Sequence, residues 1–202
     1  MPKIGAIILA AGMSIRMGEP KLLLPLRGQP LFRHVIHPIV GSSMQPIFLV
    51  AGKYIEEIRQ HCADFPELKI IHNPKYADGM STSLKLGVQS IKEQVDAVMI
   101  FLADQPLISP DVIQALIKKY TACKDEGIRI VQPKYKGDLG HPILVDAVIL
   151  NEFHSIEGDQ GGKNIIRKYA RVTETVPFDD PMWGFDIDTP QDFLKVKLHL
   201  DS

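Results

Sequence analysis

The segment LAAGMSIRMGEPK, near the N-terminus, contains the side chains with the most specific chemistry in this sequence. It continues an apolar stretch of strand length, Ile4 to Leu9. Gly12 and Gly18 can adopt positive φ and, having no Cβ, let backbone N–H groups approach phosphate oxygens. Arg16 offers a planar fork of donors and Lys21 a movable charge. The segment therefore predicts a phosphate-binding loop for a nucleoside triphosphate.

The spacing of this loop differs from that of a P-loop, which requires Gly-x-x-x-x-Gly-Lys-Ser/Thr. Here five residues separate the two glycines, and Glu19 and Pro20 precede Lys21. An ATPase of the P-loop class is therefore disfavoured. The alternative is a solvated loop whose basic residues only face water.

Three aspartates could hold a divalent metal. Asp104 follows the apolar run 97–103, and the carboxyl ends of strands form the ligand crevice of an open α/β sheet. Mg²⁺ usually takes one or two carboxylates together with substrate phosphates, so a second acid should converge on Asp104. Asp186 and Asp188 lie on one face of an extended segment and are both candidates. The alternatives are an ordinary turn at Asp104 and a helix N-terminus that favours Asp188.

Two further segments could recognise substrate. Ser81, Thr82 and Ser83 open a predicted helix, where hydroxyls could hydrogen-bond a pyrimidine or a ribose and the helix N-terminus could face phosphate. Helix capping explains one of these hydroxyls but not all three. His141 could act as an acid, a base or a hydrogen-bond donor, or it could be structural. It lies in the irregular region 134–162, where we expect the second substrate.

Alternating strands and helices must position these groups. Continuous apolar runs predict buried parallel strands over 4–10, 46–51, 97–103 and 128–132. A helix with Ser109 as N-cap is predicted by apolar residues at i, i+3, i+4 and i+7 from Ile113. The pattern indicates a doubly wound, mostly parallel α/β sheet with helices on both faces.

Other local signals are weaker. The stripe Leu84, Val88 and Ile91 predicts a helix capped by Ser81 or Thr82. Pro38 falls within the apolar stretch 31–40 and should cost a helical hydrogen bond and kink a helix there. The region 134–162 reads as loops around a short strand at 142–145, and Thr189 with Asp192 predicts the capped start of a last helix.

Bulk properties exclude several classes of protein. A chain of 202 residues fits one domain, 1–202, with a core that needs neither disulfides nor a structural metal. A formal net charge of −1 without a long basic run argues against a nucleic-acid surface. Cys62 and Cys123 are isolated thiols, which we expect to be small core residues. No apolar run approaches a membrane span or a secretion signal, so we expect a soluble, unexported, cytoplasmic protein.

Six motifs of this sequence together resemble the MobA-like nucleotidyltransferases, and within them the molybdenum cofactor cytidylyltransferase (MocA-like) branch. The likeness extends along almost the whole chain. The motifs are LAAGxSxRMGxxK with LLLPLRGQPL after it, NPKYADGMSTSL from Asn73, LADQP from Leu102, GHP from Gly140, GDQGGK from Gly158 and DIDTPQD from Asp186.

This resemblance implies a Rossmann-like nucleotidyltransferase fold and Mg²⁺-dependent transfer of CMP from CTP to the phosphate of molybdenum-bearing molybdopterin. It implies that Arg16, Lys21 and Asp104 are catalytic and that Asp104 with one or both of Asp186 and Asp188 holds the metal. The implied acceptor-binding residues are His141, Asp159 and Lys163. The implied nucleotide-binding residues are Leu9, Ala10, Ala11, Gly12, Ser14, Arg16, Lys21, Gly79, Ser81 and Ser83.

Two positions bear on substrate identity. Ala11 stands where the guanylyltransferase branch has glycine, which favours CTP over GTP. Gly162 and Lys163 replace the alanine and arginine of the family's Gly-Asp-x-Gly-Ala-Arg stretch, and lysine cannot reproduce a bidentate arginine contact. Three alternatives stay open: another nucleotide, another small phosphorylated acceptor, or a non-enzymatic carrier that delivers the finished cofactor to a molybdenum hydroxylase.

Overall fold

A mostly parallel sheet forms the centre of the computed structural model, which describes residues 1–158 and 162–201. The strand order is β10-β7-β9-β6-β1-β4-β5, and β8 pairs with β7. Strand β9 is antiparallel to both of its neighbours, and β8 is antiparallel to β7. A separate antiparallel pair is formed by β2 (Pro25–Leu26) and β3 (Gln29–Pro30). The strands of the main sheet are β1 (Ile4–Ala10), β4 (Ile47–Ala51), β5 (Leu68–His72), β6 (Ala97–Leu102), β7 (Ile130–Tyr135), β8 (Asp138–Leu139), β9 (Ile143–Asp146) and β10 (Thr173–Phe178).

Strand β1 shows why the central strands are apolar throughout. Its side chains alternate between two hydrophobic clusters, with Ile8 in one and Ile7 in the other, and both residues are fully buried. A strand covered on both faces needs apolar residues at every position. The predicted strands at 4–10, 46–51 and 97–103 are confirmed to within one residue. The strand predicted over 128–132 begins two residues later and continues to Tyr135.

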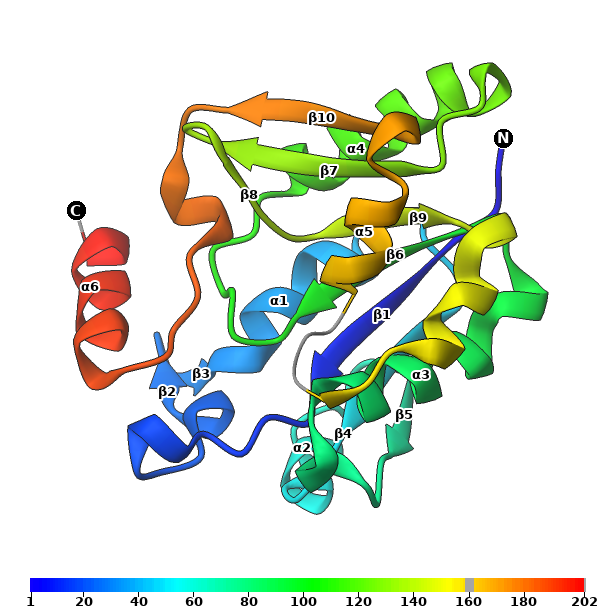
Figure 1. Cartoon of the computed structure of the whole chain (residues 1–202). Coiled ribbons are helices and arrows are strands. Elements are labelled where there is room, and N and C mark those ends of the chain that lie inside the picture. The colour runs from blue at the N-terminus through cyan, green and yellow to red at the C-terminus, as the bar shows by residue number, and fades with distance from the viewer. Residues whose placement is uncertain (159–161, 202) are drawn as a thin grey trace.

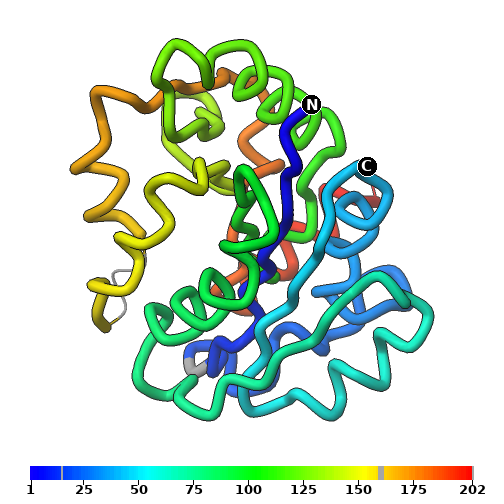
Figure 2. The backbone as a smooth tube through the Cα atoms, turned by 90° about the vertical axis from the view of Figure 1, so that its right-hand side faces the viewer, coloured from blue at the N-terminus to red at the C-terminus, as the bar shows by residue number. Residues whose placement is uncertain are grey.

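Helices cover both faces of the sheet, as predicted. Helices α1, α2 and α4 contribute to the first cluster, and α3 and α5 to the second. Figure 1 shows α1 and α4 behind the sheet and α5 in front of it. In the side view of Figure 2, β1 runs between α1 and the segment around residues 150–170. The helices are α1 (Leu31–Val40), α2 (Ile55–Gln60), α3 (Met80–Ile91), α4 (Pro110–Cys123), α5 (Lys163–Lys168) and α6 (Pro190–Asp201), and Ala147–Ser155 forms 3₁₀ turns.

The structure corrects some expectations. Strands β5 and β10, which the apolar runs did not predict, lie at the two edges of the sheet, where exposure interrupts the apolar pattern. Helix α3 begins at Met80 with Gly79 as N-cap, so the predicted caps Ser81 and Thr82 are wrong and lie inside its first turn. Helix α1 continues through Pro38 to Val40.

Several local predictions are confirmed. Ser109 caps α4, because its Oγ accepts a hydrogen bond from the backbone N–H of Asp111. Thr189 and Asp192 form a reciprocal capping box at the start of α6. Cys62 and Cys123 are buried and unpaired. The short strand predicted at 142–145 is β9.

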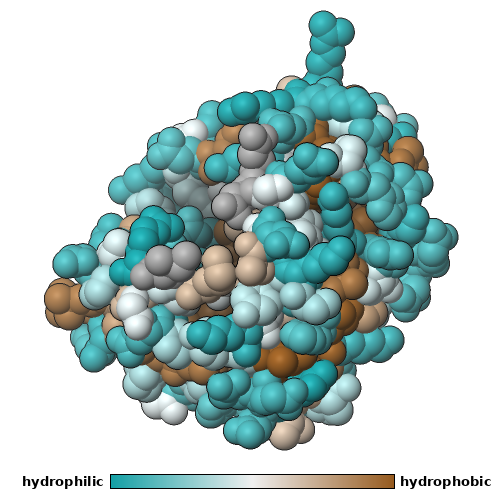
Figure 3. Space-filling model, turned by 60° about the horizontal axis from the view of Figure 1, so that its bottom comes forward, coloured by the Kyte–Doolittle hydropathy of each residue, from teal (hydrophilic) through white to brown (hydrophobic). Residues whose placement is uncertain are grey.

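The surface is mainly hydrophilic on the face shown in Figure 3, where hydrophobic residues are scattered among polar ones. Within residues 1–158 and 162–201, every helix is too short or too polar to traverse a lipid bilayer.

Candidate active site

The loop after β1 is closed by a hydrogen bond between Lys21 and Ser14. The backbone N–H of Lys21 donates to Ser14 Oγ over 3.1 Å, which folds the loop back on itself. Ser14 and Gly18 have positive φ values of 54° and 72°. Of the two glycines that can adopt positive φ, Gly18 does so and Gly12 does not, and Ser14 takes the left-handed conformation as well. The space around Gly12 is open, since a Cβ there would meet no atom within 4 Å.

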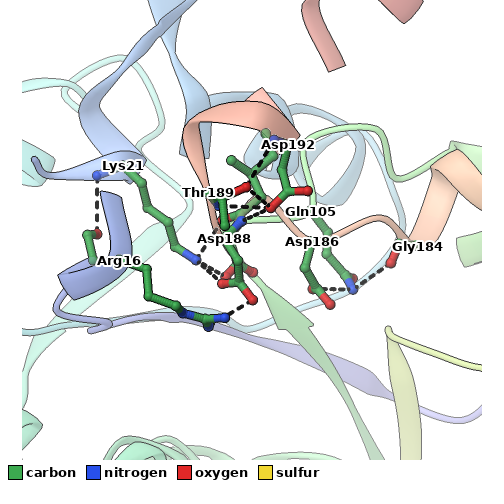
Figure 4. A network of polar contacts seen from close by, with 11 residues as sticks. Arg16, Lys21, Gln105, Gly184, Asp186, Asp188, Thr189 and Asp192 are labelled. Atoms are coloured by element: carbon green, nitrogen blue, oxygen red, sulfur yellow. Dashed lines mark hydrogen bonds and ion pairs between the residues drawn. The ribbon is translucent and has the colours of Figure 1, made fainter. Parts of the chain in front are cut away.

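The Lys21 side chain reaches across the carboxyl ends of the strands. Lys21 is only 8% exposed. Its Nζ donates to Asp104 Oδ2 at 2.6 Å, to the backbone oxygen of Ile187 at 2.7 Å and to Asp188 Oδ1 at 2.9 Å. Burial lowers the pKa of Lys21, but the charges and hydrogen bonds of Asp104 and Asp188 outweigh it and raise the pKa above its ordinary value. The ammonium group is thus charged and held between two carboxylates (Figure 4).

Arg16 approaches the same carboxylate from the solvent side. Its guanidinium lies 2.9 Å from Asp188 Oδ2, and 69% of its side chain is exposed. Burial raises the pKa of Asp188, but Lys21 and Arg16 lower it more, so the net pKa lies below the ordinary value. Asp188 is therefore an ionised acceptor shared by the two basic residues.

Asp186 points away from Lys21 and Asp188, toward Gln105 (Figure 4). Gln105 Nε2 donates to Asp186 Oδ1 at 2.8 Å. Desolvation and the negative charges of Asp104 and Asp188 raise the pKa of Asp186 to about 6, although the residue as a whole is exposed. Ile187, between the two acids, is fully buried and donates its N–H to the backbone oxygen of Asp104. The structure therefore brings all three predicted aspartates to one edge of the sheet.

A cavity of about 340 Å³ lies beside the first loop. Most of the predicted nucleotide-binding residues line it, but two do not. Ala10 is buried in the core, and Ser81 is 2% exposed and does not reach the cavity. The predicted residues that line it are Leu9, Ala11, Gly12, Ser14, Arg16, Lys21, Gly79 and Ser83, together with Asp104 and Asp188.

Asn73 orders the segment between Tyr76 and Ser83, which also lines this cavity. Its side chain is 3% exposed, and its Nδ2 donates to Thr82 Oγ1 and Ser83 Oγ. The Thr82 hydroxyl contacts the backbone oxygens of Lys75 and Gly79 as well. Thr82 thus holds the segment together, whereas Ser83 faces the cavity. Tyr76, which sequence reasoning did not single out, also lines the cavity.

A second cavity of about 460 Å³ lies on the other side of Arg16. His141 and Lys163, two of the predicted acceptor-binding residues, line it. Asp159 lies outside the described residues. Burial, with a smaller contribution from the charge of Lys163, lowers the pKa of His141 to about 4, so its ring is neutral at pH 7. One wall is apolar and includes Leu84, Ile100, Ile143, Val145, Phe153 and Ile166.

The two cavities share a wall. Its members come from β1, the first loop, α3, β6 and the segment before α6, so residues distant in sequence meet there. They are Leu9, Arg16, Met80, Leu102, Asp104 and Asp188.

The acids at this wall suit a hard divalent cation. Among the described residues, no group of three acidic, histidine or cysteine side chains is arranged to enclose a metal on its own. A magnesium site does not require such a cage, because substrate phosphates usually complete its coordination. The donors are all carboxylate oxygens, and the raised pKa of Asp186 reflects desolvation and an excess of nearby negative charge. The donor set fits a divalent metal bound together with phosphates.

Comparison with known proteins agrees with this architecture. A family model described as the MobA-like NTP transferase domain matches residues 6–172. The molybdenum cofactor cytidylyltransferase of Escherichia coli K12 is 30% identical over 198 residues, covering 98% of this chain and 97% of that protein.

Two solved structures share the fold. Rv0371c of Mycobacterium tuberculosis H37Rv, in complex with manganese, has a TM-score of 0.76 at 19% identity and covers 97% of this chain and 98% of its own. CMP:2-keto-3-deoxy-manno-octonic acid synthetase, complexed with CTP, has a TM-score of 0.77 at 14% identity over 98% of both chains. The predicted fold class is confirmed.

Proposed function

This chain belongs to the MobA-like NTP transferase family and is a nucleotidyltransferase; from this premise we propose that it transfers CMP from CTP to the phosphate of molybdenum-bearing molybdopterin. The products are molybdopterin cytosine dinucleotide and pyrophosphate. The E. coli relative, which matches over nearly its whole length, supports this choice of reaction.

The observation that carries the proposal is the wall shared by the two cavities. A group transfer needs a donor site and an acceptor site whose reacting atoms meet at one place. Arg16, Asp104 and Asp188 line both cavities at their junction. Charged groups therefore stand where a nucleotide phosphate and an acceptor phosphate would come together.

The reaction needs alignment and charge neutralisation more than a strong base. An oxygen of the acceptor phosphate forms a bond to the α-phosphorus of CTP, while the bond from that phosphorus to the bridging oxygen of pyrophosphate breaks. The attacking oxygen is already anionic, so no proton has to be removed from it. Arg16 and Lys21 are the cations that line the first cavity, and their role is to bind and neutralise the phosphates.

We propose that Asp104, together with Asp186 or Asp188, holds a magnesium ion with the nucleotide phosphates. When bound, such an ion neutralises phosphate charge and orients the transferred group. The manganese complex of the M. tuberculosis neighbour supports a divalent metal in proteins of this fold.

Support for CTP comes from the first cavity. Ala11 and Ser83 line it, the first at the position where the guanylyltransferase branch has glycine and the second with a hydroxyl suited to a pyrimidine edge or a ribose. The CTP complex of the synthetase neighbour shows that this fold accepts a cytidine nucleotide in another protein.

The second cavity suits an acceptor that is part apolar and part anionic. Its apolar wall can cover a ring system, Lys163 supplies a positive charge, and the neutral His141 ring can donate or accept one hydrogen bond. These features support molybdopterin, whose fused rings carry a terminal phosphate.

The test is a product analysis. The protein is incubated with Mg²⁺ and molybdenum-loaded molybdopterin, and with CTP, GTP or ATP in separate reactions. Pyrophosphate release is followed in time, and the product is identified by mass. We expect a cytidine dinucleotide from CTP and at most a small fraction of that rate from GTP or ATP.

Each other outcome is informative. A preference for GTP or ATP would contradict the proposed nucleotide. Pyrophosphate release only with a different phosphorylated acceptor would contradict molybdopterin. Binding of the finished cofactor without any transfer, followed by its delivery to a molybdenum hydroxylase, would replace the enzyme by a carrier.

A further inference from the structure

We propose that Gln105 is the positioning residue that directs Asp186 to the metal, and that its two amide hydrogens hold residues 184–186 in place, while Lys21 and the Ile187 N–H bind the following residues to Asp104. This inference rests on the proposed metal-dependent reaction. Gln105 also lines the second cavity, and the role proposed for it here is to orient Asp186.

The contacts of Gln105 are specific and buried. Gln105 is 4% exposed, although it lies next to the partly exposed Asp104 just after β6. Its Nε2 donates to Asp186 Oδ1 at 2.8 Å and to the backbone oxygen of Gly184 at 3.1 Å. Both amide hydrogens are therefore directed to a segment about 80 positions later in the sequence.

A third bond joins the same two segments. The backbone N–H of Ile187 donates to the backbone oxygen of Asp104 at 3.0 Å. Residues 104–105 thus bind residues 184–187 at three points, two of which depend on the Gln105 side chain. Without that side chain, the backbone bond, the burial of Ile187 and the contacts of Lys21 with Ile187 and Asp188 would remain, but none of these contacts orients the Asp186 carboxylate.

Gly184 shows how tightly the segment is placed. A Cβ at position 184 would overlap the Tyr135 ring, so this backbone lies directly against that ring. The Tyr135 hydroxyl donates to the backbone oxygen of His141, which fixes the ring. The segment is therefore confined between Tyr135 and Gln105, and only Gln105 donates a hydrogen bond to the Asp186 carboxylate among the contacts described.

Glutamine suits this role better than other amino acids of similar size. Methionine would fill the same volume without a donor, and the carboxylate would lose its partner. Asparagine would keep the amide but withdraw it by one methylene. Groups that orient a metal ligand through a hydrogen bond typically change metal affinity by about 10–100-fold when they are removed.

The experiment measures Mn²⁺ and CTP binding separately. Mn²⁺ affinity is determined from the free-ion electron paramagnetic resonance signal at saturating CTP. CTP affinity is determined by calorimetry in EDTA. We expect Gln105→Met to weaken Mn²⁺ binding about 10–100-fold and to leave CTP affinity in EDTA unchanged, because Gln105 does not line the nucleotide cavity.

Gln132→Met is the matched control. Gln132 is another buried glutamine, 3% exposed, and it lines neither cavity. The Gln132→Met protein should bind Mn²⁺ with the affinity of the wild type. If Gln105→Met does not fold, the same measurements are made on Gln105→Asn. We expect its Mn²⁺ affinity to lie below that of the wild type.

Three outcomes would overturn the inference. One is an unchanged Mn²⁺ affinity in the folded variant. Another is a parallel loss of Mn²⁺ and CTP affinity, which would indicate general disruption. In both cases a wild type that binds CTP and Mn²⁺ leaves the proposed function standing. A wild type that binds neither would overturn the proposed function and, with it, the role of Gln105.

Discussion

Lys21→Met removes the ammonium group that bridges Asp104 and Asp188 while keeping a side chain of similar length. In the wild type, Nζ makes three hydrogen bonds between 2.6 and 2.9 Å, two of them to carboxylates. Hydrogen bonds to charged groups contribute about 1.5–3 kcal/mol each in favourable settings. Solvent weakens these two, because the side chains of Asp104 and Asp188 are 23% and 35% exposed.

We therefore expect the free energy of unfolding to fall by about 2–3 kcal/mol, which lies below the range for fully buried ion pairs. For a chain of this length, that corresponds to a Tm lower by about 4–12 °C. Because the net pKa of Lys21 is raised above 10.5, its contribution is fully present below about pH 10.5 and is lost only as the pH rises through the folded-state value. The difference between wild type and variant should thus be constant from pH 7 to 9.

The same substitution should lower kcat by about two to three powers of ten, the usual effect of losing one group that stabilises transition-state charge. The assay is pyrophosphate release at 25 °C, with the melting curve recorded on the same preparation. Lys118→Met, on the exposed face of α4, is the control and should change neither quantity. A Lys21→Met protein with full turnover would refute the phosphate-binding role, and one with an unchanged Tm would refute the bridging role.

Three further predictions concern stability. Gly184→Ala should lower the free energy of unfolding, measured by urea denaturation, by about 1–3 kcal/mol, because its Cβ would overlap the Tyr135 ring. Gly12→Ala is the control and should lower it far less, because the added Cβ meets open space. Equal losses in the two variants would contradict the packing described. Burial lowers the pKa of His141 from 6.5 to about 4, so as the pH falls the unfolded chain takes up a proton first, and the free energy of unfolding should decrease between about pH 6.5 and pH 4. His141→Asn should reduce this pH dependence, measured by urea denaturation at several pH values. An unchanged pH dependence would rule out the buried neutral ring. Thr189→Ala removes the cap of α6 and should lower the free energy of unfolding by about 1 kcal/mol, whereas no change in the denaturation midpoint would mean that the capping box contributes nothing.

Features that depend on residues close together in the chain could be predicted from the amino-acid sequence. The continuous apolar runs of β1, β4 and β6 reflect burial on both faces. The Ser109 cap, the capping box of α6 and the basic loop each depend on residues a few positions apart. Strands β5 and β10 escaped prediction because an edge strand, partly exposed, shares its mixed pattern with loops.

The pairing of residues that are distant in the sequence could be seen only once the chain was folded. The contact of Lys21 with Asp188 spans 167 positions, and that of Gln105 with Asp186 spans 81. The sequence named Lys21, Asp104 and Asp188 as site residues, but it did not indicate that the lysine lies between the two acids. Such contacts depend on the order of strands in the sheet and on which side chains are desolvated there, and neither is encoded by local periodicity.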